Sequence, residues 1–222
     1  MRSVTLLPSL REEQIMNELR YPMIGLDRLR METDGEGVTT LVAGGGCPLS
    51  CHYCINKKLL AKAPAEHVTA SELYKRVSID DLYFRATGGG VTFGGGESLL
   101  HASFIKEFRG LCPSEWNIYA ETSLAVPREH ILCVCNAVDY FIVDCKDMNP
   151  DIYHRYTGGE EKLMEENLKL LLDSCGPERV RVRVPLIPGY NTPEDQAKSA
   201  QSLREMGVSK IELFNYVIRD TE

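Results

Sequence analysis

The chain has 222 residues, of which 43% are hydrophobic, and a formal net charge of −7 at neutral pH with a pI near 5.4. This length and composition are typical of one globular domain, and the acidic balance excludes a broad electrostatic surface for nucleic acid or an anionic membrane. No run of about 18 apolar residues occurs and the N-terminus lacks a signal-peptide core, so we expect a cytoplasmic protein without a membrane span.

Residues 1–30 are rich in charge and predict an N-terminal extension that packs on a core domain formed by residues 31–222. Within the extension, a short helix is expected over residues 11–19, because Pro22 cannot continue it. The core begins with the turn sequence Asp-Gly-Glu-Gly at residues 34–37, which leads into a β-branched strand over residues 38–43.

Helices and strands then alternate to the end of the chain. A helix at 71–77, capped by Thr69 or Ser71, is followed by strands at 91–93, 116–120, 140–143, 180–187 and 210–214 and helices at 99–111, 127–136, 160–174 and 193–206. Six strands alternating with helices predict an α/β protein with a parallel sheet, because parallel neighbours need crossover helices. Six strands are too few for a closed eight-stranded barrel, which leaves a partial (β/α)6 TIM-type barrel and a doubly wound sheet as alternatives.

The most specific stretch is Cys-Pro-Leu-Ser-Cys-His-Tyr-Cys, which brings together Cys47, Cys51 and Cys54. This spacing would place the thiols on one face of a helix, as buried side chains. However, the preceding glycines and Pro48 oppose a helix, so we expect a loop that can wrap thiolates around an inorganic centre. A zinc site usually needs a second C-x2-C pair, which this chain lacks, whereas three thiolates on an iron–sulfur cubane leave one iron open.

The three cysteines, with the aromatic Tyr53 before the last, resemble the C-x3-C-x2-C motif of the radical S-adenosylmethionine (radical SAM) superfamily. The resemblance implies that Cys47, Cys51 and Cys54 hold a 4Fe-4S cluster and form the catalytic centre. Its open iron binds the amine and carboxylate of S-adenosyl-L-methionine (SAM), with Tyr53 among the cofactor-binding residues. The resemblance also favours the partial barrel over the doubly wound sheet.

A glycine-rich segment, Gly-Gly-Gly-Val-Thr-Phe-Gly-Gly-Gly-Glu, occupies residues 88–97. Glycines let a backbone approach a ligand closely, and an adjacent carboxylate accepts hydrogen bonds from an ammonium group, although a flexible turn is the alternative. The segment resembles the Gly-Gly-Glu motif of the superfamily, which assigns binding of the SAM amino group to Gly95, Gly96 and Glu97. More narrowly, its Gly-Gly-Val-Thr-Phe resembles the glycyl-radical-enzyme activating enzymes, and this similarity extends over residues 25–217.

Two further pairs follow predicted strands. Glu121 and Thr122 resemble an acid and threonine pair near SAM that helps to hold a monovalent cation, with a polar turn as the alternative. Asp144 and Lys146 follow an apolar strand that delivers both to one face, where they can pair with the amine and carboxylate of an amino acid. The resemblance places this second pair beside SAM and a bound peptide, and a plain salt bridge is the alternative.

Arg183 lies between β-branched neighbours, where an arginine is costly to bury without an anionic partner. The resemblance assigns contact with the SAM carboxylate to Arg183. Arg181 shares the same strand face and is the alternative.

The resemblance implies a radical SAM oxidoreductase that cleaves SAM to methionine and a 5′-deoxyadenosyl radical, which removes hydrogen from a glycine of a partner glycyl radical enzyme. The chain departs from the activating enzymes at Thr39, Gly94, Ser98 and Val217, and it ends at Glu222. Thr39, Gly94, Val217 and the end at Glu222 favour an alternative in which a peptide or small molecule is modified. A second alternative, of a different class, is a metal or iron–sulfur carrier without turnover.

Lysines follow the cysteine loop at Lys57, Lys58 and Lys62. They predict a docking surface for an acidic electron donor such as flavodoxin, with an ordinary solvated face as the alternative. Eight cysteines in a cytoplasmic chain indicate metal or redox chemistry rather than a disulfide framework. The five outside the motif are expected to be buried small side chains; they are Cys112, Cys133, Cys135, Cys145 and Cys175.

Overall fold

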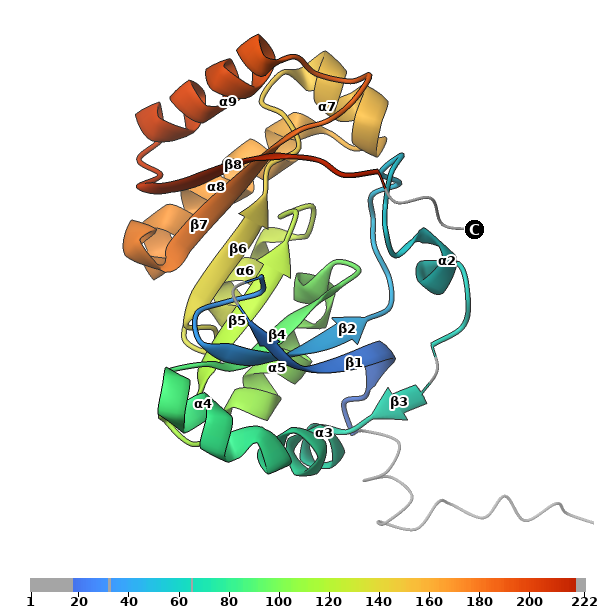
Figure 1. Cartoon of the computed structure of the whole chain (residues 1–222), viewed down its shortest axis with the longest axis vertical. Helices are drawn as coiled ribbons and strands as arrows, with labels where there is room; N and C mark the ends of the chain where they lie inside the picture. The colour runs from blue at the N-terminus through green and yellow to red at the C-terminus, as the bar shows by residue number, and fades with distance from the viewer. Residues whose placement is uncertain (1–17, 32, 65, 219–222) are drawn as a thin grey trace, which may run out of the picture.

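The computed structural model describes residues 18–31, 33–64 and 66–218, and within these ranges the chain forms one curved sheet in the strand order β3-β1-β2-β4-β5-β6-β7-β8 (Figure 1). Six strands from β2 to β8 run parallel to one another. They are the six strands predicted from the sequence, so the parallel α/β fold is confirmed. Their bounds are β2 Val38–Gly44, β4 Gly90–Gly95, β5 Asn117–Thr122, β6 Tyr140–Asp144, β7 Val180–Leu186 and β8 Lys210–Asn215.

Two strands were not predicted: β1 (Tyr21–Met31) and β3 (Glu66–Val68). β1 runs antiparallel to both β2 and β3, and its register with β2 shifts twice along its length. These irregularities, of the β-bulge kind, obscure the alternation by which a strand is recognised in a sequence. Residues 21–31 therefore join the sheet, whereas the division into an extension and a core domain stays a prediction. Most of the helix predicted at 11–19 lies outside the described residues.

Helices cover the outer side of the sheet, and the sheet does not close, because β3 and β8 are its two edges (Figure 1). The partial TIM-type barrel is therefore confirmed, with Thr69 as the N-cap of α3. The structure adds α2, α4 and α7, and the predicted helix at 99–111 begins as a 3-10 turn. The helices are α2 Lys57–Leu60, α3 Ala70–Val77, α4 Asp81–Thr87, α5 Ala102–Arg109, α6 Arg128–Val134, α7 Pro150–Thr157, α8 Glu161–Cys175 and α9 Pro193–Glu205, with 3-10 turns η1 Ser78–Asp80, η2 Ser98–His101 and η3 Pro177–Arg179.

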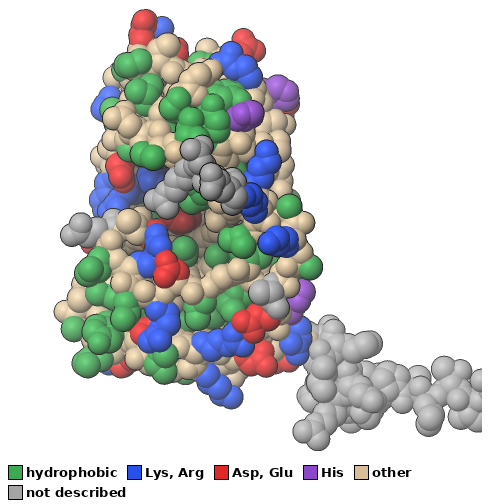
Figure 2. Space-filling view, turned by 45° about the vertical axis from the view of Figure 1, so that its right-hand side comes forward, with side chains coloured by type: hydrophobic (Ala, Val, Ile, Leu, Met, Phe, Trp, Pro, Cys, Tyr) green, Lys and Arg blue, Asp and Glu red, His purple; other side chains and the backbone are tan. Residues whose placement is uncertain are grey.

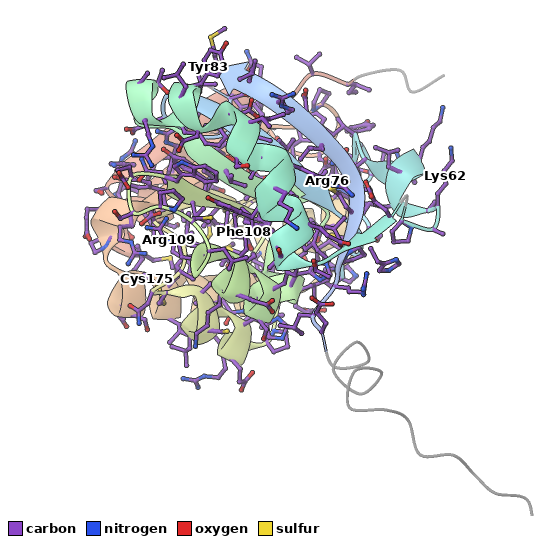
Figure 3. All side chains as sticks on the ribbon, turned by 90° about the horizontal axis from the view of Figure 1, so that it is seen from below. Lys62, Arg76, Tyr83, Phe108, Arg109 and Cys175 are labelled. Carbon is purple, nitrogen blue, oxygen red and sulfur yellow. A yellow bond between two sulfur atoms is a disulfide. The ribbon has the colours of Figure 1, made fainter. Side chains whose placement is uncertain are left out.

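The hydrophobic core lies between the sheet and these helices. The rings of Phe93 in β4 and Phe108 in α5 pack with their centroids 5.3 Å apart, and both are fully buried. Phe108 is labelled in Figure 3. Because alternate residues of a strand point to opposite faces, the other residues of the same strands face the inside of the barrel. The inner face thus receives Glu121, Asp144 and Arg183, and the outer face receives the apolar residues.

A disulfide joins Cys135 to Cys175 (Cys175 is labelled in Figure 3). Both are buried as predicted, but they are bonded to each other, a pairing that the sequence analysis did not predict. The C-terminal ends of α6 and α8 bring together residues 40 apart in sequence, with their Cα atoms 5.2 Å apart. Cys145 is buried and free as predicted, and Cys112 and Cys133 are free and half-buried. None of the helices in the described ranges has the length and apolar character of a membrane span.

The loop after β5 is held by one buried amide of α8. Asn167 Nδ2 donates hydrogen bonds of 2.8 Å to the carbonyls of Leu124 and Val126. Leu124 has a φ of 59°, a left-handed conformation that leucine rarely adopts. The surrounding structure must therefore hold this loop in place, and Asn167 supplies the hydrogen bonds that do so.

We expect Asn167→Ala to lower the free energy of unfolding by about 1–3 kcal/mol, because it leaves two buried carbonyls without a donor. Urea denaturation followed by circular dichroism measures the change. Gln201 of α9 also donates from a side-chain amide, but on the exposed surface to Glu205, so Gln201→Ala should change stability by less than about 0.5 kcal/mol. Equal effects of the two variants would contradict the role given to Asn167.

Candidate active site

The three cysteines of the motif lie on a loop between β2 and α2, as predicted. α7 holds one side of this loop: the amides of Ser50 and His52 donate to the carbonyls of Thr157 and Tyr156, at 2.8 and 3.0 Å. On its other side, the amide of Gly45 donates to the carbonyl of Pro22 in β1 at 2.7 Å. The cysteine loop therefore has a defined backbone path at the carboxyl ends of the parallel strands, where sites on such sheets gather.

The glycine segment after β4 is joined to the cysteine loop by backbone hydrogen bonds. The amides of Gly96 and Glu97 donate to the carbonyls of Gly44 and Gly46, both at 2.9 Å. A Cβ at residue 96 would lie only 2.1 Å from the carbonyl oxygen of Gly46, so no other residue permits this approach. The cysteine motif and the Gly-Gly-Glu motif thus form one unit, although about 40 residues separate them in the sequence.

The Glu97 carboxylate is buried and binds groups of the protein itself. Its Oε1 accepts from the Thr122 hydroxyl at 2.6 Å and the Leu99 amide at 3.1 Å. Its Oε2 accepts from the amide and the hydroxyl of Ser123, at 2.8 and 2.6 Å. Glu97 therefore ties the end of β4 to the end of β5, and its assignment to the SAM amino group stays a prediction.

A charged network occupies the inner face at the ends of β5, β6 and β7. Arg183 Nε donates to Asp144 Oδ1 at 2.8 Å, and its Nη2 lies 3.0 Å from Glu121 Oε1. Lys146 Nζ lies 3.1 Å from Asp144 Oδ2. The structure brings these four predicted residues together, and each side chain is mostly buried, with 15 to 26% exposed.

Burial and neighbouring charge act in opposite directions on these groups. Burial raises the pKa of Glu121 to about 7. The positive charge of Arg183 acts to lower this pKa, and the negative charge of Asp144 acts to raise it. Burial would also raise the pKa of Asp144, but the charges of Lys146 and Arg183 outweigh it and lower that pKa to about 2. For Lys146, burial lowers the pKa but the Asp144 carboxylate outweighs it, so the pKa is raised. Asp144 and Lys146 are therefore both charged at neutral pH.

Gly94 makes room for the Glu121 side chain. A Cβ at residue 94 would lie 2.6 Å from Glu121 Oε2 and 3.1 Å from Leu41 Cδ1. The departure from the activating enzymes at Gly94 thus has a physical reason in this chain, because the carboxylate that reaches Arg183 occupies the space of the missing side chain.

The remaining predicted residues lie in different surroundings. Arg181 lies further toward the start of β7, with Nη2 3.6 Å from Glu36, so Arg183 rather than Arg181 joins the network. Thr122 bonds to Glu97 while Glu121 bonds to Arg183, so this pair directs its side chains to different partners. Tyr53 packs in an aromatic cluster with ring centroids 4.8 to 6.3 Å away; the cluster comprises His52, Tyr156, Tyr190 and Tyr216.

The sequence analysis did not identify three residues that hold the cysteine loop in place. Asn56 Nδ2 donates to the carbonyl of Gly95 at 2.8 Å, and His101 Nε2 lies 2.9 Å from the carbonyl of Gly45. The Tyr216 hydroxyl donates to the carbonyl of Tyr53. All three act on backbone carbonyls, and no sequence motif marks such contacts.

The donor set of the loop fits an iron–sulfur cluster. The Cys47 side chain is exposed, yet partial desolvation by its neighbours still raises its pKa, and burial raises the pKa of Cys51 against the charge of Lys146. Both are thiols at neutral pH, so cluster binding must release their protons. Within the described ranges, no three His, Cys, Asp or Glu side chains, the motif cysteines included, are placed to hold one metal ion. The thiols therefore fit a cluster by their chemistry, and the loop must bring them together when it binds.

Comparison with known proteins agrees with this geometry. The model of the Radical SAM superfamily matches residues 41–211. The chain is 30% identical over 188 residues to the pyruvate formate-lyase 1-activating enzyme of Escherichia coli K12, covering 82% of this chain and 76% of that protein. It is 34% identical over 131 residues to the indoleacetate decarboxylase activating enzyme of Tractidigestivibacter scatoligenes, covering 59% of this chain but only 41% of that protein.

Among solved structures, SuiB of Streptococcus suis superposes with a TM-score of 0.61 at 12% identity, over 82% of this chain and 40% of that one. Native anSMEcpe with bound AdoMet superposes with a TM-score of 0.58 at 17% identity, covering 78% of this chain and 49% of that one. At these identities the likeness supports the fold alone, whereas the family match extends over most of the chain. The chain therefore belongs to the radical SAM superfamily and is related to the glycyl-radical-enzyme activating enzymes.

Proposed function

We propose that this chain is a radical SAM enzyme that removes a hydrogen atom from a glycine of a partner glycyl radical enzyme. The observation that carries the proposal is the joining of the three-cysteine loop to the Gly-Gly-Glu segment by backbone hydrogen bonds, beside a buried charged network. The curated relatives, named as activating enzymes of pyruvate formate-lyase and of two arylacetate decarboxylases, support this kind of partner.

Each residue of the site has a role in this proposal. Cys47, Cys51 and Cys54 would hold a 4Fe-4S cluster, which when bound would supply the one electron that cleaves SAM to methionine and a 5′-deoxyadenosyl radical. The Asp144 carboxylate binds the ammonium group of SAM, and the Arg183 guanidinium binds its carboxylate.

The remaining groups shape the cofactor site. The backbone at Gly95 and Gly96 forms one wall, and the aromatic cluster around Tyr53 excludes water from the other side. A monovalent cation beside Glu121 and Thr122 stays a prediction. So does the cytoplasmic location, where reducing conditions would keep the three motif thiols free but would oppose the Cys135–Cys175 disulfide.

Two variants test the SAM site. We expect Cys51→Ala to lose the iron-dependent absorbance and SAM cleavage together, because a cluster ligand is gone. Asp144→Asn should keep the absorbance and weaken SAM binding by about tenfold or more, since a charged hydrogen bond contributes about 1.5–3 kcal/mol. Anaerobic reconstitution, isothermal titration with SAM and chromatography of 5′-deoxyadenosine after dithionite addition provide the measurements.

Asp173→Asn, on the exposed side of α8, is the matched control and should change neither quantity. Iron binding by the wild-type chain without 5′-deoxyadenosine would support the carrier alternative and refute the enzyme. Unchanged SAM affinity in Asp144→Asn would refute the role given to Asp144.

The partner is tested by electron paramagnetic resonance. Incubation of the reduced enzyme and SAM with a glycyl radical enzyme of the same organism should produce a glycyl radical doublet, because the abstracted hydrogen comes from a backbone Cα. Replacement of the target glycine by alanine in the partner should abolish the doublet. Production of 5′-deoxyadenosine with no doublet on any such partner would favour the peptide or small-molecule alternative.

The size match between Gly94 and Glu121 is tested by a double-mutant cycle. Gly94→Ala should weaken SAM binding about tenfold, because its Cβ displaces the Glu121 carboxylate from beside Arg183. Glu121→Asp shortens the acid, so in the double variant we expect most of the lost affinity to return. Additive losses of affinity in isothermal titration would mean that the two positions act independently.

We also propose that the surface around α2 docks an acidic electron donor. Lys57, Lys58 and Lys62 are exposed beside the cysteine loop, and Lys62 projects away from the sheet (Figure 3). The side chains of Ile55 and Leu59 are exposed among them. Basic side chains lie on the side of the molecule that carries α2 (Figure 2), which suits a partner of opposite charge.

Charge reversal of all three lysines to glutamate should slow reduction by flavodoxin about tenfold at low salt, because long-range attraction raises the association rate. Stopped-flow absorbance of the cluster measures the rate. Equal charge reversal at three exposed lysines of α8 and α9 is the control, with little effect expected; these are Lys162, Lys169 and Lys198. Equal slowing by both triple variants would mean that net charge alone controls the rate.

A further inference from the structure

One buried hydroxyl of the molecule has no hydrogen-bond partner. Tyr153 of α7 is fully buried, and in the described part of the chain its Oη is the only buried side-chain nitrogen or oxygen without a partner. Such a group typically costs about 1–3 kcal/mol of stability. An orphaned hydroxyl in an otherwise satisfied interior therefore indicates a partner that joins the protein later.

The Tyr153 ring lies near Leu49 of the cysteine loop. The last turn of α7, one turn further along, accepts the backbone hydrogen bonds from Ser50 and His52. A Cβ on Gly159 would lie 3.6 Å from the Tyr153 ring and 2.4 Å from Leu49 Cδ2. The Tyr153 ring and the cysteine loop therefore both lie next to Gly159. Ser50 and His52 flank Cys51, so these two hydrogen bonds hold Cys51 against the end of α7. Burial raises the pKa of Tyr153, and negative charge on Cys145, Cys51, Glu97 and Glu161 raises it further.

Three of these four neighbours are poor candidates for its partner. The Glu161 side chain makes no hydrogen bond to the Tyr153 hydroxyl. The Glu97 carboxylate already accepts four hydrogen bonds. Burial and adjacent negative charge raise the pKa of Cys145, so it stays a neutral thiol, which is a weak acceptor. Cys51 differs, because binding to iron turns its thiol into a thiolate and adds negative charge at that sulfur.

We propose that the Tyr153 hydroxyl donates a hydrogen bond to sulfur at the Cys51 corner of the bound cluster and thereby raises the reduction potential of the cluster. This inference rests on the proposed function. A donor to cluster sulfur stabilises the reduced form more than the oxidised form, since the reduced cluster carries one more negative charge. Tyr153 is thus a positioning residue that makes the cluster easier to reduce before SAM is cleaved.

The test is Tyr153→Phe, which keeps the buried ring and removes only the hydroxyl. In the reconstituted protein we expect the cluster to be about tenfold harder to reduce, which corresponds to a potential about 59 mV more negative for one electron. Redox titration followed by electron paramagnetic resonance measures the potential. Tyr119→Phe is the matched control: its hydroxyl donates to the carbonyl of Glu36, away from the cysteine loop, and the potential should not change.

A second measurement separates tuning from folding. Without a cluster, Tyr153→Phe should be as stable to urea as the wild type or more stable, because the hydroxyl it removes has no partner. Equal reduction potentials in Tyr153→Phe and the wild type would overturn this inference. If the wild type still cleaved SAM, the proposed function would stand. Loss of apo stability in Tyr153→Phe would also overturn it, since the hydroxyl would then have a partner within the protein. A wild-type chain that binds no cluster would refute both proposals.

Discussion

The structure depends on the close approach of two backbone segments at the carboxyl ends of β2 and β4. The amides of Gly96 and Glu97 reach the carbonyls of Gly44 and Gly46, and an approach this close requires a residue without a side chain. Because this contact sets the path of the cysteine loop, it also sets where the thiols of Cys47, Cys51 and Cys54 are presented. In the proposed function the cysteines hold the cluster, and the glycines fix where the cysteine loop lies.

Successive side chains of the parallel strands point to opposite faces of the sheet, so the two faces have different roles. One set of residues builds the apolar core under the helices, and the residues between them bring Glu121, Asp144 and Arg183 to the inner face. Two acids and two bases in close contact leave each charge compensated while no ligand is bound. A zwitterionic ligand can exchange these pairs for its own ammonium and carboxylate, so the network is suited to an amino-acid moiety.

Support for the cysteine loop comes from several parts of the chain, and each acts on the backbone rather than on the thiols. Asn56, His101 and Tyr216 bind loop or strand-end carbonyls, and α7 accepts from two loop amides. Against this satisfied background the free hydroxyl of Tyr153 is an exception. Residues that surround a metal centre commonly orient and tune it, and α7 connects this hydroxyl directly to the loop.

The sequence by itself determined the six parallel strands, the α/β class and the loop character of the cysteine motif, because β-branched runs, glycines and prolines act locally. It also singled out Asp144, Lys146 and Arg183, since charged residues at the ends of apolar strands are costly to bury, and these side chains are in contact in the structure while their role at SAM stays a prediction. Tertiary structure alone decided the pairing of β1 and β3, the Cys135–Cys175 disulfide, the place of Glu121 in the space left by Gly94, and the partners of Glu97. All of these join segments distant in the chain, and local patterns carry no information about which distant group will fill a given space.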